Sequence, residues 1–168
     1  LWLTAPDTPP IDAWFEAMSG LTTTGSSIYG GERAIADLSP GVHLWRSQLQ
    51  WIGGIGIVVI SLALLPLLIG GGGFKAFRAE VPGLDTDRIA PRIRDTAFIL
   101  YRFYLGLTLT VFCALVACGV GGFDALCHAM TCVSSGGFSP YDDRVEGLRS
   151  AAAEWVLIGG MLLAGCNF

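Results

Sequence analysis

Charge is scarce in this 168-residue chain, because charged residues make up 14% of it and hydrophobic residues 52%. A soluble domain carries about 25% charged residues, so we expect most of the chain to lie in lipid. The net charge of −4 leaves no basic face for nucleic acid. The first residues have no basic start and no long apolar core, so a signal peptide is not expected. The last run, 156–168, stops inside an apolar segment, so the chain is interpreted as a fragment of a longer protein.

Arrangements of catalytic residues are also lacking. The sequence shows no serine–histidine–acid spacing and no paired carboxylates within an apolar run, and His43 lies far from His128. The five cysteines lie in apolar runs without zinc-type spacing, so they are interpreted as packing residues: Cys113, Cys118, Cys127, Cys132 and Cys166. We therefore expect no cofactor and no enzymatic activity.

Long uncharged runs are what the sequence does have. Residues 47–69 carry no charge, and 23 residues of helix span a hydrocarbon core of about 30 Å. A second run covers 96–119 and is interrupted only by Arg102, and a third begins at Ala151. The predicted fold is an all-α integral membrane protein.

Two apolar runs, 11–20 and 123–133, are too short to cross a membrane as helices. Each carries an acidic residue near its start, Asp12 and Asp124, where a carboxylate suits the positive end of the helix dipole. The sequence therefore predicts two re-entrant helices that begin near these residues.

The segment 70–95 lies between the first two spans and is rich in basic residues. With Arg102 just beyond it, it holds six of the ten basic residues of the chain: Lys75, Arg78, Arg88, Arg92, Arg94 and Arg102. The positive-inside rule places this segment in the cytoplasm, so both short helices belong to the outer side.

An internal repeat relates the two short helices. Asp12 matches Asp124, Met18 matches Met130 and Gly25 matches Gly137, all at an offset of 112 residues. Ile52-Gly-Gly54 recurs as Ile158-Gly-Gly160 at an offset of 106. Two copies of a short helix, a hydroxyl-glycine loop and a span indicate a duplication. Glu16 and His128 stand at equivalent positions on the short helices. Either could serve the pore, but burial with a hydrogen-bond partner is the commoner outcome and is what we expect.

The hydroxyl-rich loops after the short helices are the candidate site. Non-helical backbone at membrane depth must face protein or a water-filled cavity, and rings of carbonyl oxygens can replace the water around a cation. Glycine permits the positive φ that such a loop needs. The alternative for Thr22 to Gly25 is a polar loop that closes a helix, with Gly25 as an ordinary C-terminal glycine.

Several motifs resemble a known family. The segments 12–25 (DAWFEAMSGLTTTG) and 50–57 (QWIGGIGI) resemble the first pore loop and following helix of the Trk/Ktr/HKT potassium-transporter superfamily. The segments 78–83 (RAEVPG) and 90–93 (APRI) resemble the linker of its bacterial TrkH branch, and 128–139 (HAMTCVSSGGFS) resembles the second pore loop.

The resemblance implies four span–loop–span units around one pore, of which this chain holds most of two. The units would be 1–69 and 96–168, joined by the cytoplasmic linker 70–95. Potassium would be bound by the selectivity filter, whose residues are Thr22, Thr23, Thr24 and Gly25 in the first unit and Ser134, Ser135, Gly136 and Gly137 in the second. The family also implies the bacterial inner membrane with periplasmic filter loops, a homodimer, and a TrkA-like cytoplasmic gating ring that binds nucleotides.

The second loop departs from the first at one position, with Gly136 where the first has Thr24. The pore would therefore not be fourfold symmetric. Two other functions stay open: sodium-coupled potassium transport, against which the linker argues, and a non-conducting membrane scaffold, which would have no need for glycine in both loops.

Overall fold

The computed structural model describes residues 8–30, 34–70, 89–143 and 145–165, without the side chains of 57–59, 61–70 and 89–95. Its elements, in chain order, are α1 (Pro10–Leu21), η1 (Ile35–Asp37), α2 (Pro40–Gly70), α4 (Ile89–Ala117), α5 (Gly122–Val133), η3 (Glu146–Leu148) and α6 (Ala151–Gly165). Across the described ranges the structure is all helical, in agreement with the predicted class.

Both short helices form where the sequence predicts them. α1 and α5 have 12 residues each, and Asp12 and Asp124 lie in their first turns. α1 begins at Pro10, whose missing N–H costs nothing at a position where that donor has no helical partner. The sequence signals for the helix starts are therefore confirmed.

The long helices contain the predicted spans. α2 holds the uncharged run 47–69, and α4 holds most of the run 96–119. α4 already begins at Ile89, inside the segment 70–95 that we assigned to the linker. Residues 71–88, with most of the basic side chains of that segment, lie outside the described part of the chain, as do Cys166 and the last residues of the third run.

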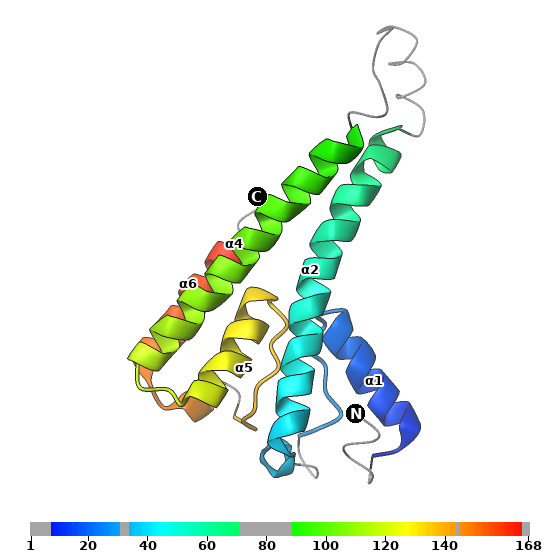
Figure 1. Ribbon diagram of the computed structural model, residues 1–168. Coiled ribbons are helices and arrows are strands. Elements are labelled where there is room, and N and C mark those ends of the chain that lie inside the picture. The colour runs from blue at the N-terminus through cyan, green and yellow to red at the C-terminus, as the bar shows by residue number, and fades with distance from the viewer. Residues whose placement is uncertain (1–7, 31–33, 71–88, 144, 166–168) are drawn as a thin grey trace, which may run out of the picture.

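α1 lies on one side of the long helix α2, and α4, α5 and α6 lie on the other (Figure 1). α1 packs on the lower half of α2, and α5 lies between α2 and α4 (Figure 1). α6 packs against both α4 and α5. Buried apolar side chains from these three helices form the main core: Leu107, Val111 and Leu115 of α4, Ala125, Ala129, Cys132 and Val133 of α5, and Ala153 and Leu157 of α6.

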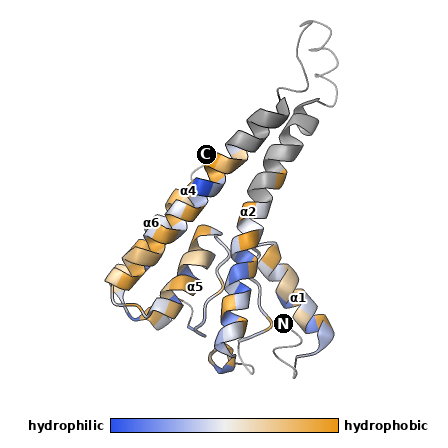
Figure 2. Ribbon diagram, in the orientation of Figure 1, coloured by the Kyte–Doolittle hydropathy of each residue, from blue (hydrophilic) through white to orange (hydrophobic). Residues whose placement is uncertain are grey.

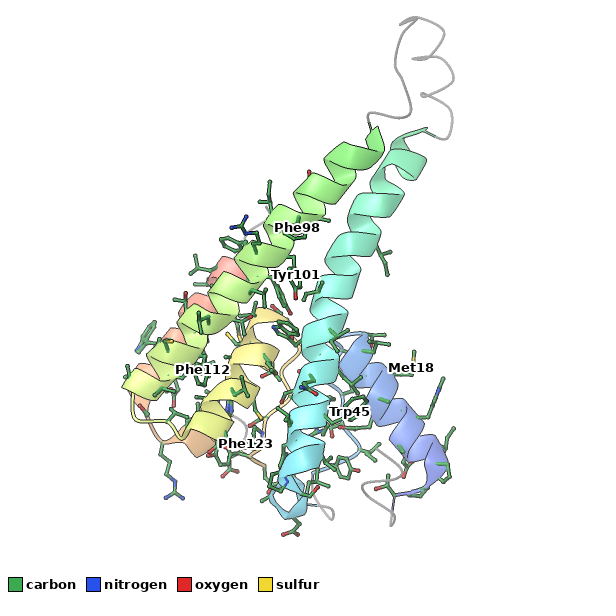
Figure 3. The ribbon with its side chains drawn as sticks, viewed as in Figure 1. Met18, Trp45, Phe98, Tyr101, Phe112 and Phe123 are labelled. Atoms are coloured by element: carbon green, nitrogen blue, oxygen red, sulfur yellow. The ribbon has the colours of Figure 1, made fainter. Side chains whose placement is uncertain are left out.

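The outer helix surfaces are apolar. Figure 2 shows hydrophobic residues over most of the described part of α4 and α6, and Figure 3 shows Met18 projecting outward from α1. Trp155 is 72% exposed and Phe98 63%. Among the described residues, one helical segment, 96–117 in α4, is long and apolar enough to cross a membrane by length and composition. Such a surface suits contact with lipid.

Candidate functional site

The two hydroxyl-rich loops leave their helices through the same hydrogen bonds. After α1, the Thr23 N–H donates to Gly20 O and the Thr24 N–H to Ser19 O, both at 3.0 Å. After α5, the Ser135 N–H donates to Cys132 O and the Gly136 N–H to Thr131 O, again at 3.0 Å. Both ends are therefore Schellman caps, and the offset of 112 residues in the sequence is repeated bond for bond.

The caps place side-chain-bearing residues in a conformation that favours glycine. Thr23 has φ of 55° and Ser135 of 54°. For a β-branched residue such as Thr23 a positive φ is a strained outlier, which persists where the surrounding structure over-determines it. The alternative in which Gly25 closes the helix is wrong, because Thr23 holds the left-handed cap position and Gly25 follows two residues later.

Backbone handedness alternates along each loop. Thr23 and Gly25 have positive φ while Thr24 does not, and Ser135 and Gly137 have positive φ while Gly136 does not. In an ordinary extended strand successive carbonyl groups point to opposite sides. Left-handed residues at every second position break that alternation and allow neighbouring carbonyls to share a side.

Most carbonyl oxygens of the loops have no protein donor. Within the described residues, no hydrogen bond reaches the carbonyls of Thr22, Thr23, Thr24, Ser134 and Ser135. The hydroxyl groups are partly engaged locally, since the Thr22 Oγ1 donates to Met18 O at 2.8 Å and contacts Thr24 Oγ1 at 2.8 Å. These five oxygens are available to bind a water-sized ligand.

The two loops lie against each other. A Cβ atom placed on Gly25 would stand 2.0 Å from the Gly136 carbonyl oxygen, closer than any real contact. Gly25 is therefore required both by its φ of 74° and by the proximity of the second loop. The structure thus brings together the two segments that the sequence predicts as one site, although they are 112 residues apart.

A cavity of about 210 Å³ adjoins the two loops. Thr23, Ser134 and Ser135 line it together with Gly54 of α2, and apolar and aromatic residues of α4 such as Tyr104 form another wall. The Tyr104 hydroxyl donates to Trp51 O at 3.0 Å, and the Trp51 Nε1 donates to Thr108 Oγ1 at 3.1 Å. These two bonds join α2 to α4 beside the cavity.

A buried ion pair supports the first loop. The Arg46 Nε donates to Glu16 Oε1 at 2.8 Å, and the two side chains are 2% and 0% exposed. The carboxylate also accepts from the Ser27 hydroxyl at 2.9 Å and from the Ile28 N–H at 3.0 Å. The Arg46 guanidinium lies over the rings of Tyr29 and Phe138, at 5.5 and 4.3 Å from their centroids. This network fixes the chain that leaves Gly25.

The second loop has a related network, in which His128 takes the place of Glu16 and, among the described residues, arginine is absent. His128 Nε2 contacts the Ser139 hydroxyl at 3.2 Å, and the Tyr141 N–H donates to Ser139 Oγ at 3.1 Å, as the Tyr29 N–H does to Ser27 Oγ. The Tyr141 hydroxyl donates to Asp124 Oδ2 at 2.7 Å. Burial and the hydrogen bond to Asp124 raise the pKa of Tyr141 to about 12. The phenol therefore keeps its proton at neutral pH and donates it in the hydrogen bond to Asp124.

The residues of these networks include several that sequence reasoning missed. Ser27 and Ser139, like Tyr29 and Tyr141, lie at the offset of 112, so extending the repeat four residues past Gly25 would have found them. The expectation that Glu16 and His128 are buried and hydrogen-bonded is confirmed, since they are 0% and 3% exposed.

Gln50 of α2 hydrogen-bonds to the backbone of the second loop. The Gln50 side chain is fully buried, donates from Nε2 to Gly136 O at 2.8 Å and accepts at Oε1 from the Phe138 N–H at 3.1 Å. Farther out, the Asp142 carboxylate accepts from the Ile35 N–H at 2.6 Å, which joins the outer loops of the two halves. Neither contact leaves a local signal in the sequence.

The register of the glycine pairs needs a correction. The sequence aligns Gly53 with Gly159, but a Cβ on Gly53 would meet the Leu21 carbonyl at 2.0 Å whereas one on Gly159 would meet nothing. Gly160 is the residue that packs on α5, since its Cβ would lie 2.8 Å from Cys132 Sγ. By contact, Gly53 corresponds to Gly160, one residue out of the sequence register.

Exposed apolar helices and two half-length helices that end in polar loops are typical of an all-helical integral membrane protein. The chain belongs to the TrkH family of cation transport proteins, whose family model matches residues 1–168.

Individual proteins of this family are similar to the chain in sequence and structure. The chain is 44% identical over 161 residues to the Trk system potassium uptake protein TrkH of Halomonas elongata, covering 95% of this chain and 32% of that protein. It is 38% identical over 165 residues to the protein of the same name in Escherichia coli K12, covering 98% and 33%. The crystal structure of the potassium transporter TrkH from Vibrio parahaemolyticus matches with a TM-score of 0.78 and 33% identity, over 97% of this chain and 31% of that one. The chain thus spans about a third of the length of these relatives.

Proposed function

We propose that the full-length protein takes up potassium across the bacterial inner membrane, and that the two loops form part of its selectivity filter. The ion is bound by the carbonyl oxygens of Thr22, Thr23 and Thr24 in the first unit and of Ser134 and Ser135 in the second. Gly25 and Gly137 supply the positive φ of each loop. The Gly136 carbonyl already accepts from Gln50, so it contributes with its second lone pair only.

The observation that carries this proposal is the pair of touching loops with unclaimed carbonyl oxygens. Desolvated carbonyls cost free energy unless a donor or a cation satisfies them, and carbonyl rings are a known means of replacing the hydration shell of potassium. The helix dipoles of α1 and α5 add to this, because the negative C-terminal ends of both helices lie at the loops. The names of the relatives, which are potassium uptake proteins, support the same ion.

Topology and partners follow from the same proposal. The basic segment 70–95 faces the cytoplasm, where a nucleotide-binding gating ring contacts it, and the filter loops open to the periplasm. α1 and α5 act as pore helices in units 1–69 and 96–168. The complete protein is a homodimer with further units outside this chain.

The test replaces Gly25 with aspartate in the full-length protein. A side chain at this position collides with the Gly136 carbonyl and disfavours the positive φ, so we expect potassium uptake to be lost while the protein still inserts in the membrane. Uptake is measured in a strain without other potassium transport, with the amount of membrane protein determined in parallel.

Two glycine variants serve as controls. Gly106→Ala changes α4 where a Cβ would meet nothing, and Gly119→Ala tests a positive φ of 86° away from the loops. Both should retain uptake. Normal uptake by Gly25→Asp would contradict the filter assignment, and potassium flux that stops without sodium would favour sodium-coupled transport.

A further inference from the structure

Among the α2 side chains that the structure describes, Gln50 is the fully buried polar one that hydrogen-bonds to the second loop. Its amide donates to Gly136 O and accepts from the Phe138 N–H, so both of its ends are bound to the backbone on either side of Gly137. Its Nε2 also lies 3.8 Å from the position of a Cβ on Gly25. A single side chain of the first unit therefore sits where the two loops meet.

The second loop is shaped around this amide. Gly136 does not have positive φ, so its backbone does not require glycine. A Cβ on Gly136 would lie 2.3 Å from Gln50 Cδ and 2.4 Å from Oε1. The departure of the second loop from the first, glycine in place of Thr24, is explained by the space that Gln50 occupies.

The second unit offers no equivalent of this contact. Val156 corresponds to Gln50 in the sequence register and Leu157 in the register of glycine contacts, and neither side chain can donate or accept a hydrogen bond. Of the two units in this chain, only the first supplies this amide contact.

We propose that Gln50 is a positioning residue that holds the filter loop of the second unit against that of the first and thereby sets the discrimination between potassium and sodium. This inference rests on the proposed filter. Gln50 fixes the direction of the Gly136 carbonyl and the path of the chain from Ser135 to Phe138. Without it, the loop can adapt to a smaller ion, because nothing else in the described residues bonds the Gly136 carbonyl or the Phe138 N–H.

The first test is Gln50→Met in the full-length protein. The two buried backbone groups lose their partners while the side-chain volume is kept, so we expect the ratio of potassium to sodium uptake to fall about tenfold at an unchanged amount of membrane protein. Gln48→Met is the matched control, because Gln48 lies on the same helix, is half-buried and has no described bond to the loop. It should leave the ratio unchanged.

The second test is a double-mutant cycle. Gly136→Ala should lower uptake at least about tenfold, because its methyl group collides with Gln50. In a Gln50→Ala background that collision is gone, and the same substitution should cost less than about threefold. Gly137→Ala is the control, since its φ of 80° is strained and no atom lies within 4 Å of its Cβ, so its cost should be equal in both backgrounds.

The wild type, Gln50→Ala, Gly136→Ala and the double variant are also melted as purified full-length proteins, which tests the contact without transport. Coupling between Gln50 and Gly136 in the melting temperatures, together with the altered ion ratio, would support the proposal. Additive effects of the two substitutions in both measurements, or a Gln50→Met variant equal to Gln48→Met, would overturn it. A wild-type protein that carries no potassium would instead contradict the proposed function, and the melting cycle would still decide on the contact.

Discussion

At the scale of single residues, Glu16 and His128 solve one burial problem in two ways. Each stands at the same place on its short helix and holds a serine of the following loop, Ser27 or Ser139. Glu16 is charged and needs Arg46, which is buried with it. The second unit has alanine at 152 and 153, the two candidate counterparts of Arg46, together with a histidine that can be neutral. The second unit thus lacks both the buried carboxylate and the arginine that pairs with it.

This pairing predicts how the first unit responds to substitution. Glu16→Gln leaves the Arg46 guanidinium buried without a counter-charge, so we expect a loss of about 3–5 kcal/mol in stability. Glu16→Gln with Arg46→Met removes both charges and should recover a large part of that loss. Thermal unfolding of the purified full-length protein measures both, and a double variant that is less stable than Glu16→Gln alone would show that the ion pair is not the cause.

The sequence predicted some of these residues and missed others for a physical reason. Glycine at positions 25 and 137 predicts a positive φ at each, and the structure confirms both. Nothing in the sequence indicates that Thr23 and Ser135 are left-handed as well, because hydroxyl residues occur in many loop conformations. The contacts of Gln50 and Arg46 were also missed, because they are tertiary. A polar residue in a helix gives the same sequence pattern whether it faces water or a buried backbone group.

At the scale of elements, close approach between helices and loops depends on glycine. Gly53 of α2 lies against the Leu21 carbonyl at the end of α1, and Gly160 of α6 lies against Cys132 of α5 and Val111 of α4. Helices that approach this closely gain packing where a side chain would separate them. The sequence showed the glycine pairs, but only the contacts show which glycine of each pair faces its short helix.

The adjacent residues Gly159 and Gly160 test that register. Gly160→Ala places a methyl group 2.8 Å from Cys132 Sγ and 2.9 Å from Val111 Cγ2, so we expect a loss of about 1–3 kcal/mol from overpacking. Among the described residues, a Cβ on Gly159 would meet no atom within 4 Å, so Gly159→Ala should be close to neutral. The melting temperatures of the two full-length variants show which glycine packs on α5. A larger loss of stability in Gly159→Ala would favour the sequence alignment, in which Gly53 matches Gly159.

At the scale of the whole molecule, the two halves of the chain meet where α2 packs on α5, an interface that we call the seam. α2 of the first half packs on α5 of the second, with Gln50 and the Arg46–Phe138 contact between them, while Asp142 links the outer loops. Helix type and bounds were predictable because apolar run length and helix-start signals are local. The seam was not predictable, because it depends on how the two copies face each other. Its arrangement around the paired loops is the basis of the filter proposal.

The central claim is that loop carbonyl oxygens take the place of water around a potassium ion. Its most direct test is the location of bound rubidium, an electron-dense substitute for potassium, in the structure of the full-length protein. The account predicts rubidium density between the two loops, within coordination distance of the Thr23 and Ser135 carbonyl oxygens. Rubidium bound elsewhere along the pathway, with these carbonyls turned away from it, would contradict the account.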